Sequence, residues 1–180
     1  MNTGFAVWVT GLPASGKSTM TAALIEKLKA LGVNVAVLES DVLRKTFTPK
    51  PRYDEEEREI FYRSMLYVGQ LLTQHRVSVI FDATANRRAY RAAARAVIPH
   101  FLEVFLDSPL SICMARDPKG IYKKGREGAA STVPGLQSRY EPPENPELVI
   151  QGGEETPESG AQKVIEALLK RGWVSGGEPF

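Results

Sequence analysis

The chain has 180 residues, of which 43% are hydrophobic, and a formal net charge of +2. This length and composition predict one globular domain over residues 1–180, and so small a net charge gives no indication of a nucleic-acid or membrane partner. The single cysteine excludes an intrachain disulfide. No leader pattern and no apolar run of membrane-spanning length are found, so we expect a cytoplasmic protein.

Residues 11–18 fit the phosphate-binding pattern G-x-x-x-x-G-K-[ST] at every fixed position. The apolar run 5–10 before them predicts a buried strand, and leucines at helical spacing predict a helix over 18–31. Two glycines let the backbone amides turn inward, and the helix N-terminus adds partial positive charge. An ordinary glycine-rich turn is the structural alternative. The residues predicted to bind ATP here are Gly11, Leu12, Pro13, Ala14, Ser15, Gly16, Lys17, Ser18 and Thr19.

Within this loop, Lys17 would reach the outer phosphates as a mobile charge, and Ser18 would offer its hydroxyl to Mg²⁺. Asp41 follows a strand predicted over 34–38, and Asp82 closes one over 77–82. Carboxyl ends of parallel strands meet where ligands bind, so we predict that both carboxylates face the magnesium ion. Helix capping by Asp41 and a cap or turn role for Asp82 are the structural alternatives.

Residues 46–53 predict a surface loop, and 54–74 a long helix with an acidic first turn. A further helix over 86–97 carries a stripe of arginines on one face. Such a stripe could contact phosphates, but we favour a solvated helix face. Its members are Arg88, Arg91 and Arg95.

A fourth strand over 101–106 leads to a short helix, in which Cys113 is expected to be a small packed residue. Residues 117–139 are rich in glycine and basic side chains and lack sustained apolar periodicity. They predict a mobile cationic lid that closes over the transferring phosphates, with a solvated basic loop as the alternative. Lys123 of this region is assigned to catalysis, and Arg116, which directly precedes the region, to ATP binding.

Residues 142–146 predict an extended linker, 147–150 a fifth strand and 158–169 a last helix, with a loose tail beyond Trp173. Five strands that alternate with helices define an α/β fold with right-handed crossovers. We therefore predict a three-layer P-loop kinase fold with a five-stranded parallel sheet.

Together these motifs resemble adenylylsulfate kinase, which transfers the ATP γ-phosphate to the 3′-hydroxyl of adenosine 5′-phosphosulfate (APS). Besides the phosphate-binding pattern, LESDVLR at 38–44 is similar to the family's LDGDNVR. DPKGIYKK at 117–124 nearly repeats the family's DPKGLYKK, and YEPPENPEL at 140–148 is similar to YEAPENPEL. The resemblance covers nearly the whole chain.

The resemblance implies that Asp41 is the carboxylate near the magnesium ion and the attacking hydroxyl. It also implies that Arg44 and Arg58 hold the phosphosulfate end of the acceptor, while Tyr53 stacks on its adenine.

Departures from the family's pattern concentrate on the acceptor side. Val133 stands where the family has a second stacking phenylalanine, and Phe61 replaces an acceptor-binding asparagine. Thr84 stands where the family has a serine credited with a phosphoenzyme or binding role. Asp82-Ala-Thr84 resembles other small P-loop kinases more closely.

We therefore predict an ATP- and Mg²⁺-dependent kinase that phosphorylates APS, with small nucleotide substrates and a possible homodimer. A kinase of another nucleotide-linked or small alcohol is the first alternative, motivated by Val133, Phe61 and Asp82. A nucleotide-dependent regulatory module is the second, although it would not need Asp41 or a complete lid. A polynucleotide kinase is a weaker alternative, suggested by the arginine stripe.

Overall fold

A computed structural model describes residues 4–175 of the chain. Its five strands form one sheet in the spatial order β2-β3-β1-β4-β5, and all four strand pairings are parallel. This confirms the predicted five-stranded parallel sheet. The strands are β1 (Ala6–Thr10), β2 (Val35–Glu39), β3 (Ser78–Asp82), β4 (Phe101–Asp107) and β5 (Leu148–Gln151).

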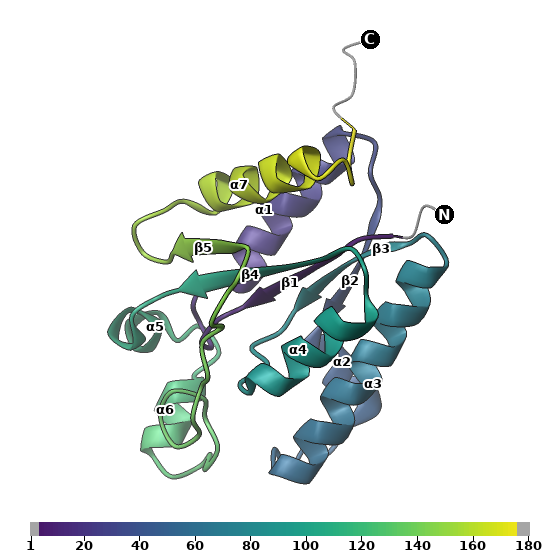
Figure 1. Ribbon diagram of the computed structural model, residues 1–180. Coiled ribbons are helices and arrows are strands. Elements are labelled where there is room, and N and C mark those ends of the chain that lie inside the picture. The colour runs from purple at the N-terminus through teal and green to yellow at the C-terminus, as the bar shows by residue number, and fades with distance from the viewer. Residues whose placement is uncertain (1–3, 176–180) are drawn as a thin grey trace.

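Helices cover both faces of the sheet and give the predicted three layers (Figure 1). One face carries α1 (Lys17–Ala30) and α7 (Pro157–Lys170), and the other carries α3 (Glu55–Gln74) and α4 (Arg88–Val97). Three short helices complete the described chain: α2 (Ser40–Phe47), α5 (Leu110–Arg116) and α6 (Ile121–Arg126). None of the helices within 4–175 is long and apolar enough to cross a membrane.

The two faces of the sheet bury separate apolar clusters, because successive strand residues point to opposite sides. In β1, Val7 and Val9 pack beneath α1 and α7, whereas Trp8 belongs to the cluster beneath α3 and α4. Trp8 stacks on Phe81 of β3, with ring centroids 4.5 Å apart. The helix α3 approaches this pair so closely that a Cβ at Gly69 would lie 2.1 Å from the Phe81 ring. The central strand thus anchors both layers.

Side chains cap two of the helix starts. The Asp54 side chain accepts a hydrogen bond from the Glu57 amide at 2.8 Å, and that of Thr156 accepts one from the Ser159 amide at 3.1 Å. The start of α2 differs, because its N-cap is Glu39 and no side chain caps it. Capping is therefore not the reason for the carboxylate at Asp41.

The helix α2 continues through Phe47, so the loop predicted over 46–53 begins two residues later. Phe47 packs against Phe61 of α3, with ring centroids 6.1 Å apart, and this contact extends the helix. The tail differs from prediction as well, because Val174 is buried against the cluster beneath α1 and α7. Residues 176–180 of the tail lie outside the described part of the chain.

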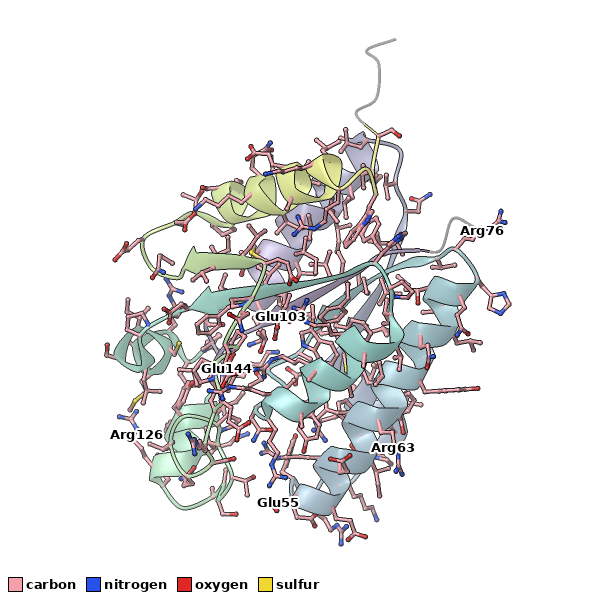
Figure 2. All side chains as sticks on the ribbon, in the orientation of Figure 1. Glu55, Arg63, Arg76, Glu103, Arg126 and Glu144 are labelled. Atoms are coloured by element: carbon pink, nitrogen blue, oxygen red, sulfur yellow. The ribbon has the colours of Figure 1, made fainter. Side chains whose placement is uncertain are left out.

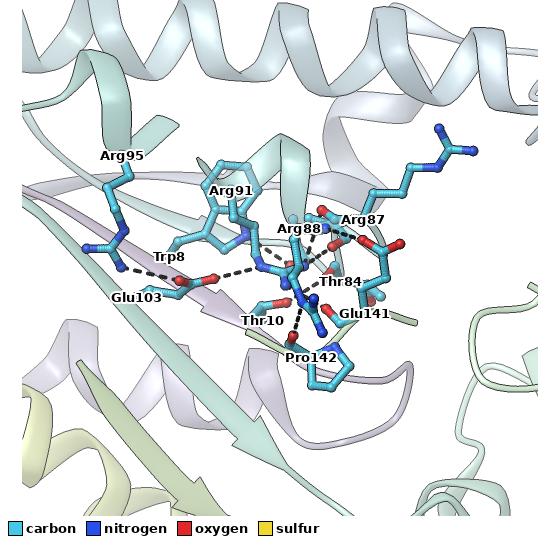
Figure 3. A network of polar contacts seen from close by, with 12 residues as sticks. Trp8, Thr10, Thr84, Arg87, Arg88, Arg91, Arg95, Glu103, Glu141 and Pro142 are labelled. Carbon is cyan, nitrogen blue, oxygen red and sulfur yellow. Dashed lines mark hydrogen bonds and ion pairs between the residues drawn. The ribbon is translucent and has the colours of Figure 1, made fainter. Parts of the chain in front are cut away.

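The prediction of a solvated arginine face on α4 is wrong for Arg91, whereas the side chains of Arg88 and Arg95 are 41% and 39% exposed. Arg91 is 1% exposed, and its Nε donates to Glu103 Oε1 of β4 at 2.7 Å (Figure 3). Arg95 also reaches Glu103, at 3.2 Å, and pairs with Glu147. Figure 2 shows Glu103 in the interior between the sheet and α4, whereas Arg76 lies at the outer edge. The carboxylate of Glu103 thus binds two of the three arginines, of which only Arg91 is buried.

The arginines of α4 also hold residues 141–147, which we call the return segment because they lead from the lid region back to β5. Arg91 Nη2 donates to the Glu141 carbonyl at 2.6 Å, and Arg88 donates to the Pro142 carbonyl at 2.6 Å (Figure 3). Arg88 additionally pairs with Glu144 at 2.6 Å. None of the three arginines lines the cleft described below. The stripe therefore anchors the return segment and does not bind phosphate there.

Candidate active site

The phosphate loop, residues 11–18, joins the carboxyl end of β1 to the N-terminus of α1. A Cβ at Gly11 would lie 2.7 Å from the Leu106 carbonyl oxygen, so only glycine allows this approach. Gly16 has φ +102°, a conformation that strains other residues. The Ser108 hydroxyl donates to the Ser15 carbonyl at 3.1 Å and ties the loop to the end of β4. The sequence pattern therefore folds into a rigid turn.

A cleft of about 950 Å³ opens above this loop at the carboxyl ends of the strands. Its size matches that of a ligand pocket. Residues 13–19 line it, whereas Gly11 and Leu12 lie outside the lining. The other sequence-predicted residues that line it are Asp41, Arg44, Tyr53, Arg58, Asp82, Thr84, Arg116 and Val133.

Lys17 is half-buried at the floor of the cleft, and its Nζ donates to the Leu12 carbonyl at 2.8 Å and the Gly11 carbonyl at 3.2 Å. Burial lowers the pKa of Lys17 to about 8, although Asp82 and Asp41 oppose the shift. The two carbonyls hold the ammonium group at the loop that it is predicted to serve. A phosphate in the cleft would add negative charge that favours the charged form of Lys17.

The two predicted carboxylates occupy different depths. Asp82 is buried, and this burial raises its pKa, while a hydrogen bond with Ser18 and the charge of Lys17 oppose the rise. Asp41 is about half exposed at the rim and pairs with Lys119 of the lid region. A deep carboxylate beside the loop and a rim carboxylate on α2 therefore face the same space.

The donor set at Ser18 and Asp82 fits Mg²⁺, because this hard cation prefers oxygen ligands. Within residues 4–175 no group of three or more His, Cys, Asp or Glu side chains could hold a metal by itself. Mg²⁺ in kinases takes only one or two protein ligands and completes its shell with phosphate and water. The site therefore suits a magnesium ion that arrives with a nucleotide.

Thr84 lies two residues beyond Asp82 and is half-buried in the cleft wall. Its backbone carbonyl accepts a hydrogen bond of 2.7 Å from the Thr10 hydroxyl at the end of β1 (Figure 3). The same hydroxyl lies 3.0 Å from the Tyr140 hydroxyl, just before the return segment. The Thr84 backbone is thus fixed to the strand that feeds the phosphate loop.

The predicted acceptor side contains two buried arginines. Arg44 pairs with Glu57 at 3.2 Å, and its guanidinium lies 3.9 Å above the Phe61 ring. Arg58 donates to the Tyr53 carbonyl at 3.0 Å and to the Thr132 carbonyl at 2.6 Å. Burial chiefly lowers the pKa of Arg58, and the charge of Arg44 adds to the shift. Two cations with one carboxylate leave a positive excess.

Phe61 does not line the cleft, since it is 1% exposed beneath Arg44. The family has an acceptor-binding asparagine at this position. In this chain Phe61 occupies it and supports Arg44 instead. Sequence reasoning missed Glu57, which it explained only as part of an acidic first helical turn. The sequence contained one indication of this role. Glu57 lies within 15 residues of the three predicted acceptor-site residues, Arg44, Tyr53 and Arg58.

The lid region, residues 117–139, contains apolar contacts that the sequence did not predict. It contains α6, and it packs a small cluster of Tyr122 and Val133 against Cys113 of α5. Cys113 is fully buried, as expected for a packed residue. The Tyr122 hydroxyl donates to the Pro13 carbonyl of the phosphate loop at 2.9 Å. The cluster could not be predicted from apolar periodicity, because Cys113, Tyr122 and Val133 come from α5, α6 and the loop after α6.

Two assignments in the lid region change with this packing. Val133 lines the cleft but is only 4% exposed, so it is a member of the cluster and not an open stacking face. Lys123 is exposed and does not line the cleft, whereas Lys119 and Lys124 do. Arg116 lies at the phosphate loop, with Nη1 3.8 Å from the position of a Cβ at Gly16.

We expect ATP binding to take up a proton near pH 8. In the protein without bound nucleotide, Lys17 has a pKa of about 8. A bound triphosphate favours the charged form of Lys17 and raises that pKa. Uptake should approach half a proton at about pH 8 and vanish near pH 6.5, where Lys17 is already charged. Calorimetry in two buffers of different ionisation enthalpy measures it. Lys27→Met should retain the uptake, and a Lys17→Met variant that retains it would contradict the assignment.

A family model described as Adenylylsulphate kinase matches residues 3–151 of the chain. The chain belongs to the adenylylsulphate kinase family. As a member of this family it is an ATP-dependent kinase that uses Mg²⁺, which confirms the predicted reaction class and cofactor.

Curated relatives in the adenylylsulphate kinase family match the chain over nearly their whole length. The adenylyl-sulfate kinase of Synechococcus sp. (strain JA-2-3B'a(2-13)) is 38% identical over 171 residues, which cover 95% of this chain and 98% of the relative. That of Microcystis aeruginosa is 40% identical over 171 residues, with 95% and 94% covered. The resemblance inferred from short motifs is therefore confirmed across the chain.

Solved structures agree with this family assignment. The Mycobacterium tuberculosis APS kinase, solved in complex with AMPPNP and APS, superimposes with a TM-score of 0.87 at 34% identity. The match covers 93% of this chain and 99% of that one. A shikimate kinase from Aquifex aeolicus matches with a TM-score of 0.57 at 14% identity, which shows a common fold alone.

Proposed function

We propose that this adenylylsulphate kinase family member transfers the γ-phosphate of ATP to the 3′-hydroxyl of APS. The observation that carries the proposal is the single cleft that joins the phosphate loop to Arg44, Arg58 and Tyr53. Its positive excess suits the two negative charges of a phosphosulfate group, and Tyr53 offers a ring for a base. The similar Mycobacterium tuberculosis enzyme was solved with APS itself.

On the ATP side, residues 13–19 would cradle the phosphates and Lys17 would contact the outer ones. Ser18 and Asp82 would hold Mg²⁺, which when bound neutralises charge on the phosphates. Lys119, Lys124 and Arg116 also line the cleft and would neutralise charge that develops during transfer.

On the acceptor side, Asp41 would align the attacking hydroxyl and accept its proton, because it is the carboxylate at the rim between α2 and the lid region. Its present partner, Lys119, would then be free to contact phosphate. Thr84 would contact the substrates from the cleft wall, and Arg44 and Arg58 would hold the anionic end. Lys123, which lies outside the cleft, is not needed in this scheme.

We also propose that the chain is a cytoplasmic homodimer. Three apolar side chains on one face of α3 are exposed: Ile60 at 47%, Tyr67 at 65% and Leu71 at 45%. They recur at helical spacing on the side of α3 that faces away from the sheet cluster, and a second copy of the chain would cover them. Sedimentation equilibrium tests this state.

The acceptor assignment is tested by incubating the protein with Mg²⁺, ATP and APS and following ADP by coupled assay and the phosphorylated product by ³¹P NMR. We expect turnover with APS and little with AMP, which lacks the sulfate that the arginines would bind. Turnover of simple alcohols in preference to APS would replace this acceptor with the small-molecule alternative.

A further inference from the structure

The loop that carries Tyr53 and the guanidinium of Arg44 are both bound by one buried carboxylate. Glu57 lies in the first turn of α3 and is 7% exposed. Its Oε1 accepts hydrogen bonds from Arg44 Nη1 and the Tyr53 amide, both at 3.2 Å, and its Oε2 accepts one from the Arg52 amide at 2.6 Å. All three partners are donors, so the position requires a group with two acceptor atoms.

Tyr53 has φ +58°, a left-handed conformation that costs free energy in a residue other than glycine. Contacts on both sides of this residue hold that conformation. The Tyr53 amide donates to Glu57, and its carbonyl accepts from Arg58 Nε at 3.0 Å. The direction of the Tyr53 ring, which lines the cleft and is 42% exposed, therefore depends on α3.

Arg44 is positioned from three sides. Its guanidinium lies 3.9 Å from the centroid of Phe61 and 4.9 Å from that of Tyr53, and Glu57 takes one of its N–H groups. A planar cation between two rings and a carboxylate loses much of its rotational freedom. Glu57 balances only one of the two buried arginines, so the excess charge for an anion remains.

We propose that Glu57 is the positioning residue of the acceptor site, which places Arg44 and Tyr53 together for one substrate while contacting none of it. Glu57 itself does not line the cleft. The inference deepens the proposed function, on which it depends only for the identity of the acceptor. It predicts that acceptor recognition, and not ATP binding, responds to a change at Glu57.

The test compares Glu57→Gln with Glu57→Asp and with Glu56→Gln in the full chain. Gln presents an N–H₂ group to a donor and leaves one bond unmade, whereas Asp keeps two acceptors on a shorter stem. Glu56 is the matched control, because it is 79% exposed and only approaches Arg52 at 3.8 Å. We expect Glu57→Gln to raise KM for APS about tenfold and to leave KM for ATP within twofold. Glu57→Asp should lie between it and wild type.

Equal kinetics for Glu57→Gln and Glu56→Gln would overturn the inference, as would an equal rise in both KM values. Hydrogen exchange at the Arg52 and Tyr53 amides gives a second readout that requires no turnover. We expect faster exchange in Glu57→Gln than in Glu56→Gln, with unchanged exchange in β1. If wild type does not phosphorylate APS, the acceptor assignment fails and the exchange data alone decide the role of Glu57.

Discussion

Replacing Lys17 by alanine should lower the rate of phosphoryl transfer by about 10²–10³-fold or more, because it removes a cation that stabilises developing charge in a cleft partly shielded from water. The fold should survive. In the structure the Lys17 ammonium group bonds only to the Leu12 and Gly11 carbonyls, and both belong to the loop itself. Single-turnover kinetics with saturating ATP and Mg²⁺ measure the loss.

Lys27→Ala is the matched control, since Lys27 lies on the same helix and its Nζ donates at 3.1 Å to Gln162 on the surface. We expect it to transfer phosphate at the wild-type rate. Circular dichroism should give superimposable spectra for both variants. Near wild-type turnover of Lys17→Ala would refute the assignment of the phosphate loop as catalytic.

Arg91→Met should destabilise the protein by about 3 kcal/mol, near the lower end of the range for a broken buried ion pair. The change leaves Glu103 buried with Arg95 as its remaining partner at 3.2 Å. It also removes the donor to the Glu141 carbonyl. Urea unfolding measures the free energy, and a thermal scan should show a midpoint lower by roughly 6–12 °C.

Arg88→Met is the control for this second expectation. Arg88 is 41% exposed in its side chain and pairs with Glu144, which is 68% exposed. Solvent screens such pairs, so we expect a loss of at most about 1 kcal/mol. Equal destabilisation by the two substitutions would show that burial at Arg91 contributes nothing of its own.

The phosphate loop could be predicted from the sequence because its chemistry is local. Gly11, Gly16, Lys17 and Ser18 act through backbone shape and through contacts within one turn, so their spacing is sufficient. The parallel sheet was predictable for a similar reason, since continuous apolar runs alternate with amphipathic helices. Strand ends then placed Asp82 and Asp41 at the cleft without knowledge of any long-range contact.

The features that sequence did not predict depend on partners far apart in the chain. Arg91 is buried because Glu103 in β4 and the Glu141 carbonyl face it, and no local pattern on α4 contains either. Glu57 has the appearance of an ordinary acidic helix start, although its side chain folds back to Arg44. In each case the side chain's role is set by tertiary packing, which outweighs helix periodicity.

The cluster of Tyr122, Val133 and Cys113 has a consequence for the entropy of substrate binding. Ordering a structureless loop costs about 1–2 kcal/mol for each backbone residue, and a substrate that ordered such a loop would lose that free energy from its affinity. Here α6 and its apolar contacts are already formed, so the cost falls on folding and not on ATP or its acceptor. Movement of residues 117–139 away from the phosphate loop would break the Tyr122–Pro13 hydrogen bond and separate Tyr122 and Val133 from Cys113 of α5. Such a movement would displace a folded body, with a barrier set by apolar contacts and not by chain disorder.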